Sequence, residues 1–245
     1  MATGAFWMGW APVADPTIDL GIDTASDDAS IALLEGDRII ATRAWSATTT
    51  VARELLAEID ALLREAAVAR HQLARLAVDI GPGQYGAVRS GIATAQGLAM
   101  ALGIPLAGVP RLDADAWPLV TPGRAVVAVH DIRGHVAWAA YDAGPDGQPR
   151  QTVAPRIDTP AEAARLAPRP ATWTGELSDT LQAARDAEGR SGDTVVRSSD
   201  APHSTSRAVT LVRIAQVRML FTDPAAVDAL YLRAPSISQP RAKAQ

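Results

Sequence analysis

Several features common in enzymes and membrane proteins are missing from this chain, and each absence narrows its chemistry. The 245 residues contain no cysteine, so no Cys–His nucleophilic arrangement is present. Of the 23 basic residues only Lys243 is a lysine, which argues against a P-loop lysine, a Schiff-base lysine and a catalytic lysine base. No apolar run reaches the roughly 18 residues needed to cross a bilayer. The first basic residue is Arg38, so the charged start of a signal peptide is absent, and we expect a cytoplasmic protein without membrane contact.

An excess of positive charge is missing as well. The formal net charge is -4, with 23 basic residues against 27 acidic ones, and the arginines are scattered along the chain. Proteins that hold nucleic acid by themselves usually carry a basic patch. Any contact with nucleic acid is therefore expected to run through a partner.

A regular pattern of apolar residues begins after residue 16. The first 16 residues show no period and are expected to form a flexible extension. Three strands with short turns come next, followed by helices and strands in alternation. Apolar residues of the first helix, from Leu55 to Ala66, fall at offsets 0, 1, 4, 7, 8 and 11, which is one face of a helix. The predicted strands are Thr17–Thr24, Ala29–Glu35, Arg38–Trp45, Leu73–Ile80 and Leu106–Val109, and the helices are Val51–Ala69, Ala87–Leu102 and Leu112–Trp117.

The same order of elements recurs from Arg124 onward. The predicted strands there are Ala125–His130, Val136–Tyr141, Gln151–Ile157, Ala171–Trp173 and Thr194–Val196, and the helices are Pro160–Leu166, Leu177–Ala187 and Ser206–Phe221. Two copies of one α/β order indicate the duplicated, ribonuclease H-like fold of the actin-like (ASKHA) superfamily, with two lobes that each hold a mixed sheet flanked by helices. The break near Asp113–Gly123 predicts a first lobe at residues 17–113 and a second lobe with its tail at 114–245.

Three stretches carry a resemblance to a known family. Leu20–Leu34 reads LGIDTASDDASIALL, Asp79–Val109 reads DIGPGQYGAVRSGIATAQGLAMALGIPLAGV, and Val126–Trp138 reads VVAVHDIRGHVAW. The second resembles the stretch GPGSFTGLRIGxATAKGLAxxLxIPLxGV of the TsaB family, and Leu230–Arg233 resembles that family's C-terminal Y-L-R. Two departures stand out: Gln84-Tyr85-Gly86 replaces the family's S-F-T, and Gln96 replaces its lysine. The resemblance covers about Thr17 to Arg233.

The resemblance implies an accessory role in the synthesis of threonylcarbamoyladenosine in tRNA. TsaB proteins are non-catalytic; they bind TsaD and are required when TsaD transfers the threonylcarbamoyl group to the adenosine beside the anticodon of ANN-decoding tRNAs. TsaC makes the threonylcarbamoyl-AMP, and the ATPase TsaE joins the complex. The resemblance thus implies partners TsaD and TsaE, a homodimer when TsaD is absent, tRNA contact only through the complex, and no cofactor.

The two long helices of the first lobe are the predicted partner interface. One carries a Leu/Ile stripe, and the other carries small residues that let a second helix approach closely. In the TsaB family this helix pair packs against two helices of TsaD. Which face of each helix turns outward stays open. The interface candidates are Leu55, Leu56, Ile59 and Leu63 on the first helix, and Ile92, Ala93, Gln96 and Gly97 on the second.

A weaker motif lies at the ends of two strands. Asp23 and Thr24 follow the first strand, and Gly81 and Gly83 precede the second long helix. In nucleotide-using members of the superfamily such residues cradle phosphates and magnesium water. Here they predict at most a vestigial phosphate loop, since Asp23 and Thr24 are also ordinary turn residues and glycines permit close packing.

Two enzymatic alternatives stay open at this point. One is a small actin-fold kinase that uses ATP at Asp23 and the glycine loops. The other is a metal-dependent peptidase of the M22 type. The four histidines, His71, His130, His135 and His203, show no i, i+4 pair, and no metal site is expected.

Overall fold

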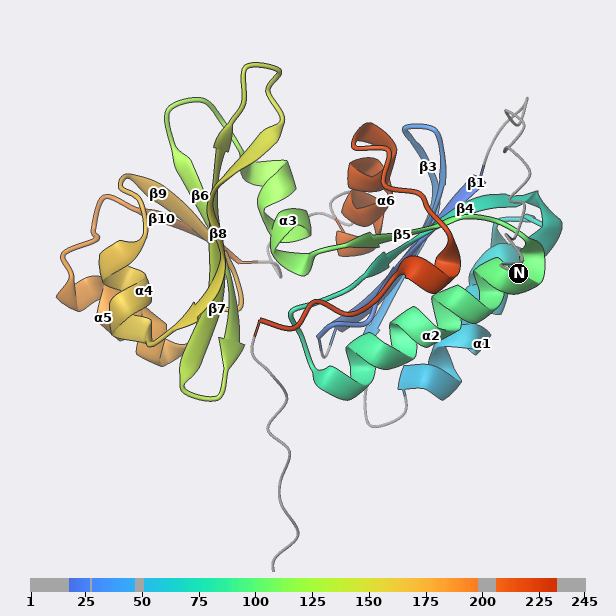
Figure 1. The fold of residues 1–245 in the computed structure, drawn as a ribbon, viewed down its shortest axis with the longest axis horizontal. Helices are drawn as coiled ribbons and strands as arrows, with labels where there is room; N and C mark the ends of the chain where they lie inside the picture. Colours follow the sequence, from blue (N-terminus) through green and yellow to red (C-terminus); the bar gives the residue numbers. More distant parts are fainter. Residues whose placement is uncertain (1–17, 27, 47–50, 198–205, 233–245) are drawn as a thin grey trace, which may run out of the picture.

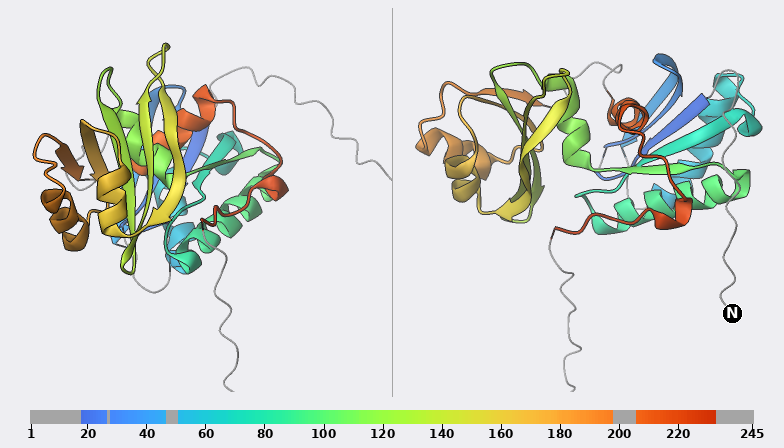
Figure 2. Two further views of the ribbon diagram at one scale, coloured as in Figure 1. Left: turned by 60° about the vertical axis from the view of Figure 1, so that its left-hand side comes forward. Right: turned by 45° about the horizontal axis from the view of Figure 1, so that its top comes forward.

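The computed structural model describes residues 18–26, 28–46, 51–197 and 206–232, arranged as two lobes (Figures 1 and 2). The predicted extension at residues 1–16 lies outside these residues. The first lobe contains a five-stranded sheet of order β3-β2-β1-β4-β5, in which β1 pairs antiparallel with β2 and parallel with β4. Its elements are β1 (Ile18–Asp23), β2 (Asp28–Glu35), β3 (Arg38–Ser46), α1 (Val51–Glu65), η1 (Arg70–Gln72), β4 (Leu73–Asp79), α2 (Tyr85–Leu102) and β5 (Leu106–Val109).

The second lobe repeats this plan. Its sheet has the order β10-β9-β6-β7-β8, with β6 antiparallel to β7 and parallel to β9. Each strand therefore takes the position of its counterpart in the first sheet, and the predicted duplicated fold with two mixed sheets is confirmed. From Arg111 onward the elements in chain order are α3 (Arg111–Ala116), η2 (Trp117–Leu119), β6 (Ala125–Ile132), β7 (His135–Ala143), β8 (Pro149–Asp158), α4 (Pro160–Leu166), β9 (Ala171–Gly175), α5 (Asp179–Ala187), β10 (Thr194–Arg197), α6 (Arg207–Val217) and η5 (Pro224–Ala226).

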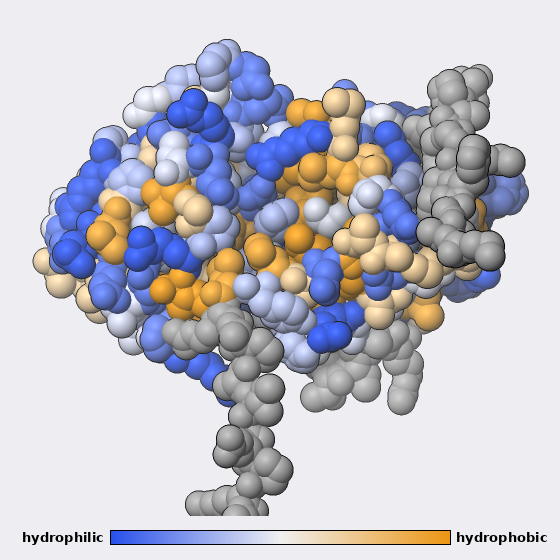
Figure 3. All heavy atoms as spheres, in the orientation of Figure 1, coloured by the Kyte–Doolittle hydropathy of each residue, from blue (hydrophilic) through white to orange (hydrophobic). Residues whose placement is uncertain are grey.

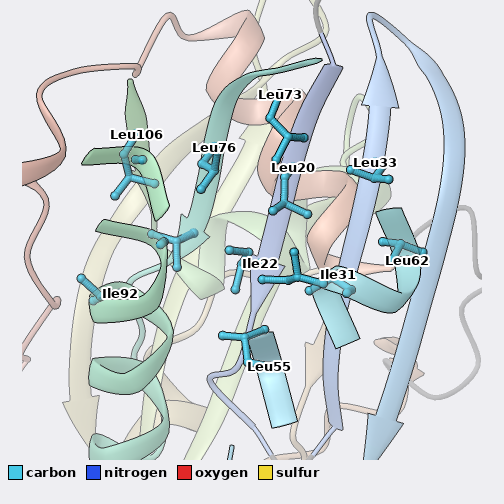
Figure 4. Packing of buried hydrophobic residues seen from close by; sticks show 14 of the residues in the cluster. Leu20, Ile22, Ile31, Leu33, Leu55, Leu62, Leu73, Leu76, Ile92 and Leu106 are labelled. Carbon is cyan, nitrogen blue, oxygen red and sulfur yellow. The ribbon is translucent and has the colours of Figure 1, made fainter. Parts of the chain in front are cut away.

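Helices cover both faces of each sheet. In the first lobe α1 and α2 pack on one face, around Leu20, Ile22 and Ile31 (Figure 4). Helix α6 packs on the opposite face against β1, β2, β4 and β5. In the second lobe α4 and α5 cover one face and α3 the other. Figures 1 and 2 place α3 and α6 in contact between the two sheets.

The last helix of each half thus lies at the boundary between the lobes. Helix α6 follows the second sheet in the chain but buries its apolar side chains on the first sheet. The segment after α6 stays with the first lobe, since Thr222 bridges to Leu106 and the Leu230 N–H donates to the Ile80 carbonyl. The part of the chain that we placed in the second lobe by sequence, 114–245, therefore sends residues 206–232 back to the first lobe. Hydrophobic periodicity predicts a buried helix face but not the sheet that covers it.

Two helices end earlier than their apolar pattern predicts. Helix α1 stops at Glu65 rather than Ala69, because Ala67 takes a left-handed conformation with φ 54°. Helix α6 stops at Val217 rather than Phe221, and Met219 is left-handed with φ 51°. None of the helices in the described parts of the chain is both long and apolar enough to span a membrane.

Candidate functional site

Four charged side chains meet between the two lobes. Asp23 ends β1, Asp79 ends β4, Asp115 lies on α3, and Arg207 opens α6. The Arg207 guanidinium joins two of the carboxylates: Nη1 is 2.5 Å from Asp23 Oδ2, and Nε is 2.8 Å from Asp115 Oδ1. All three aspartates are buried. Burial alone would lower the pKa of Arg207, but the charges of the three aspartates outweigh it and raise that pKa well above its usual value.

A second arginine extends this network into the second lobe. The Arg111 side chain is fully buried, and its Nη2 donates to Glu176 Oε1 at 2.6 Å. Arg111 Nη1 lies 3.0 Å from His130 Nδ1 and 3.4 Å from the Ala25 carbonyl. His130 Nδ1 is also 2.8 Å from Glu176 Oε2. Burial would raise the pKa of Glu176, but the His130 hydrogen bond and the Arg111 charge outweigh it and lower that pKa to about 2.

Asp79 has a carboxylate oxygen without a partner, as does Asp115 among the described residues. Its Oδ1 accepts a 2.6 Å hydrogen bond from the Gly81 N–H, whereas its Oδ2 is buried with no hydrogen-bond partner among the described residues. Burial and the nearby charge of Asp23 raise the pKa of Asp79 well above its usual range. A buried carboxylate without a full set of partners is destabilising when ionised.

We expect Asp79→Asn to raise the free energy of unfolding at pH 7, by on the order of 1 kcal/mol. In the natural chain the Asp79 carboxyl ionises near its usual pKa when unfolded but resists ionisation when folded. The free energy of unfolding of the natural chain therefore falls as pH rises, whereas the variant escapes this loss because an amide never ionises. Urea denaturation at pH 7 and pH 3 measures it, and the gain should vanish at the lower pH. Asp23→Asn is the matched comparison and should have the opposite sign, because both Asp23 oxygens have partners. A destabilised Asp79→Asn at pH 7 would contradict this view of the site.

The residues of the predicted phosphate loop do come together. Thr24 Oγ1 donates to the Ala87 carbonyl at 2.9 Å, so it fastens the end of β1 to α2. A Cβ at Gly83 would lie 2.3 Å from the Ala25 carbonyl oxygen, which requires glycine there. Gly81 has a φ of +92° and donates to Asp79. These contacts match the structural explanation of the motif, in which turn residues and glycines allow a strand end and a helix to pack closely.

The carboxylate of Asp23 is fully engaged within the protein. Asp23 Oδ1 accepts from the Ala25 N–H and Oδ2 pairs with Arg207, so no lone carboxylate faces outward at this motif. Within the described residues, no group of three or more His, Asp or Glu side chains is arranged to hold a metal. Arg111, Asp79, Asp115 and Arg207 were not identified from sequence. For Asp79 the sequence did offer a signal, since this residue is an acid at the end of the apolar strand LARLAVD.

Half of the predicted interface residues face inward, and this corrects the expected docking stripe. Leu55, Ile59 and Leu63 on α1 are 0–4% exposed and belong to the core of the first lobe, as does Ile92 on α2. Figure 4 shows Leu55 pointing toward the first sheet, beside Ile22 and Ile31. The Leu/Ile stripe is thus the face that α1 buries on its own sheet.

The other four predicted residues lie at or near the surface. Leu56 on α1 is 55% exposed, and Ala93 and Gly97 on α2 are exposed. A Cβ built at Gly97 meets no atom within 4 Å. Gln96 is half-buried, because its side-chain amide donates to the Pro224 and Val227 carbonyls. Sequence spacing alone could not decide which face of α2 turns outward.

An exposed stripe runs along α2, and we call it the α2 face. Its members recur at every third or fourth position, which places them on one side of the helix; they are Tyr85, Arg89, Ala93, Gly97 and Met100. At its start the Tyr85 ring stacks at a tilt on Tyr231, with centroids 5.8 Å apart, and Arg89 Nη1 bonds both hydroxyls at 2.7 and 3.3 Å. Figure 3 shows hydrophobic and hydrophilic residues side by side on the part of the surface around α2.

Comparisons with known proteins agree on one family. The model of the TsaD family, "tRNA N6-adenosine threonylcarbamoyltransferase", matches residues 46–172. TsaB of Escherichia coli, a tRNA threonylcarbamoyladenosine biosynthesis protein, is 30% identical over 131 residues, which are 52% of this chain and 56% of that protein. A tRNA N6-adenosine threonylcarbamoyltransferase of Dinoroseobacter shibae is 35% identical over 122 residues, 43% of this chain and 34% of that one.

A solved structure extends the similarity to most of the fold. YeaZ from Pseudomonas aeruginosa superposes with a TM-score of 0.68 and 25% identity, over 87% of this chain and all of that one. The similarity to the curated relatives is less extensive: this chain matches between about a third and just over half of the length of those proteins. The family model nevertheless matches more than half of this chain. The chain therefore belongs to the family of the threonylcarbamoyltransferase TsaD, and within it to the TsaB (YeaZ) proteins.

Proposed function

We propose that this chain is a non-catalytic, cytoplasmic subunit in the synthesis of threonylcarbamoyladenosine in tRNA, and that it binds TsaD and is required for the transfer that TsaD performs. The observation that carries the proposal is the exposed α2 face, with Ala93 and Gly97 at its centre, on a protein in which Arg207 already holds the carboxylates of Asp23 and Asp115. Ala93 and Gly97 leave room for a partner helix to approach closely. TsaD is the partner implied by the family, and TsaE joins the assembly through it.

The charged network supports a non-catalytic role. A kinase of this fold would need the Asp23 carboxylate for magnesium water, but in this chain Arg207 holds that carboxylate at 2.5 Å. A metal-dependent peptidase would need ligands for the ion, but His130 is engaged by Arg111 and Glu176. Titration with Mg-ATP, and metal analysis of untagged protein, would each reveal the corresponding enzyme through stoichiometric binding.

We expect the same surface to serve both a homodimer and the TsaD complex. A C2 dimer uses one self-complementary patch on each copy, and the exposed side chains of Leu56 and Met100, each 55% exposed, favour association through this side of the first lobe. TsaD should therefore compete with the second copy of the chain and dissociate the homodimer. Size-exclusion chromatography with light scattering measures this: the chain alone should run as a dimer, and with equimolar TsaD from the same organism as a heterodimer. Two species that ignore each other at micromolar concentration would contradict the proposal.

Contact with tRNA is expected only within that complex. The net charge of the isolated chain is -4, so its binding to a phosphate backbone would release few counterions. Its affinity for tRNA should therefore be low at physiological salt. A filter-binding titration with tRNA tests this at fixed salt. Submicromolar binding by the chain alone would mean that it is itself an RNA-binding subunit.

A further inference from the structure

Arg89 is the only charged residue of α2. The 18 residues of this helix, Tyr85–Leu102, include no acidic side chain and no second basic one. Arg89 is exposed on the α2 face, and no ion pair joins it to an acid among the described residues. The exposed arginines of α1 and η1 differ, since Arg64 and Arg70 both pair with Asp60. The α2 face therefore carries a positive charge for which the described part of the chain supplies no counterion.

Two exposed tyrosines fix the position of the Arg89 guanidinium, and we call the three residues the Tyr–Arg cluster. Arg89 Nη1 donates to the hydroxyls of Tyr85 and Tyr231, and the central carbon of the guanidinium lies 5.4 Å from the centre of the Tyr85 ring. Tyr231 belongs to the segment that returns to the first lobe after α6, so two distant parts of the chain meet here. A side chain that is already held in place loses less conformational entropy when a partner binds it.

The part of the guanidinium that stays free is the edge that binds carboxylates elsewhere in this protein. Arg89 Nε and Nη2 form no hydrogen bond with any described residue. Arg75 uses the same two atoms to hold both oxygens of Asp19, at 2.9 and 2.6 Å. Arg156 does so with Asp158, at 2.5 and 2.8 Å. Such a two-donor edge matches the geometry of a carboxylate and makes a more directional contact than the ammonium group of a lysine.

The rest of the α2 face does not determine how a partner helix lies along it. Ala93 and Gly97 permit close approach, and Met100 adds an exposed apolar side chain, but none of the three side chains has a group that pairs in one direction. A charged contact at one end of the face sets the register, because a shift of the partner leaves both charges unpaired. Arginine and tyrosine are also enriched among the residues that dominate the binding energy of interfaces.

We infer that an acidic side chain of TsaD binds the free edge of Arg89, and that the Tyr–Arg cluster thereby fixes the register of TsaD on the α2 face. The inference rests on the proposed function, since TsaD is the partner proposed for this face. A second copy of the chain fits the cluster less well. If it paired through its own α2, it would bring another Arg89 and no acid from that helix.

The test is calorimetric titration of TsaD with the natural chain, Arg89→Met and Arg89→Lys, each at low and at physiological salt. Arg89→Met keeps an unbranched side chain without the charge, so its affinity for TsaD should fall on the order of 30-fold at low salt. Arg89→Lys keeps the charge but loses the two-donor edge, and its affinity should lie between the two. Added salt should weaken the natural complex more than the Arg89→Met complex, because salt screens a pair of charges.

The control is Arg165→Met, which removes the same charge from an exposed position on α4 of the second lobe and should leave the affinity unchanged. An Arg89→Met chain that binds TsaD as tightly as the natural chain, or loses affinity with no change in salt dependence, would overturn the inference and leave the proposed function standing. So would a loss confined to the homodimer, which would place the acid on the second copy, or an Arg89→Met chain that does not fold. A natural chain that does not bind TsaD would overturn both.

Discussion

Replacing Gly21 with alanine is expected to lower the free energy of unfolding by about 3 kcal/mol, the upper end of the usual cost of overpacking. Gly21 lies in the middle of β1, and a Cβ built there would be 2.1 Å from the Ala208 carbonyl oxygen. That atom belongs to the backbone of the first turn of α6, so it cannot move aside as a flexible side chain would. The added methyl must push α6 away from the first sheet.

Urea denaturation followed by circular dichroism measures this loss. Gly97→Ala is the matched control, since it adds the same methyl to an exposed helix position with no atom within 4 Å. Alanine is favoured over glycine inside helices, so the control should gain about 0.5–1 kcal/mol. If Gly21→Ala unfolds at the same urea concentration as the natural chain, α6 does not pack on β1 as described.

Gly97→Arg is expected to abolish capture of TsaD while leaving the chain folded. The position is open to solvent in the single chain, so the arginine side chain fits there without disturbing the core. At an interface built on close helix contact, the same side chain would hold the helices apart or bury an unpaired charge, at a cost of about 3–5 kcal/mol. Affinity should then fall by roughly 100-fold or more, since about 1.4 kcal/mol corresponds to a tenfold change.

The control for this variant is Gly192→Arg. Gly192 is also exposed, a Cβ added to it would meet no atom within 4 Å, and it lies in the turn before β10 of the second lobe. Gly192→Arg adds the same charge as Gly97→Arg, but at a position in the second lobe that is distant in sequence from the α2 face. Calorimetric titration with TsaD distinguishes the two variants. Equal affinities for Gly97→Arg and Gly192→Arg would place the interface elsewhere.

Sequence periodicity predicted the elements because local patterns determine them. The offsets of the apolar residues in α1 require one buried face, and the strand sequences alternate or run apolar as buried strands do. The same reasoning assigned Leu55, Ile59 and Leu63 to a docking surface, but these three side chains are buried on the first sheet. An amphipathic stripe covers the nearest sheet before it is available to another protein.

The interlobe network was beyond the reach of sequence patterns for a different reason. Asp23 and Arg207 are 184 residues apart, and Arg111 and Glu176 are 65 apart. No helical or strand period relates such positions. The packing of α6 on the first sheet brings Arg207 to Asp23, and the packing of α3 on the second sheet brings Arg111 to Glu176. The predicted phosphate-loop residues were located correctly at the strand ends, but the arginine that fills the site could not be anticipated from them.

The central claim is that this chain activates TsaD as a stoichiometric partner and contributes no catalytic group. The most direct test is to titrate the chain into a fixed amount of TsaD with tRNA and threonylcarbamoyl-AMP, and to measure the initial rate of transfer. The account predicts a low rate without the chain, a rise that saturates at one chain per TsaD, no such rise with Gly97→Arg, and no transfer by the chain alone. A rate that is independent of the chain, or transfer in the absence of TsaD, would contradict it.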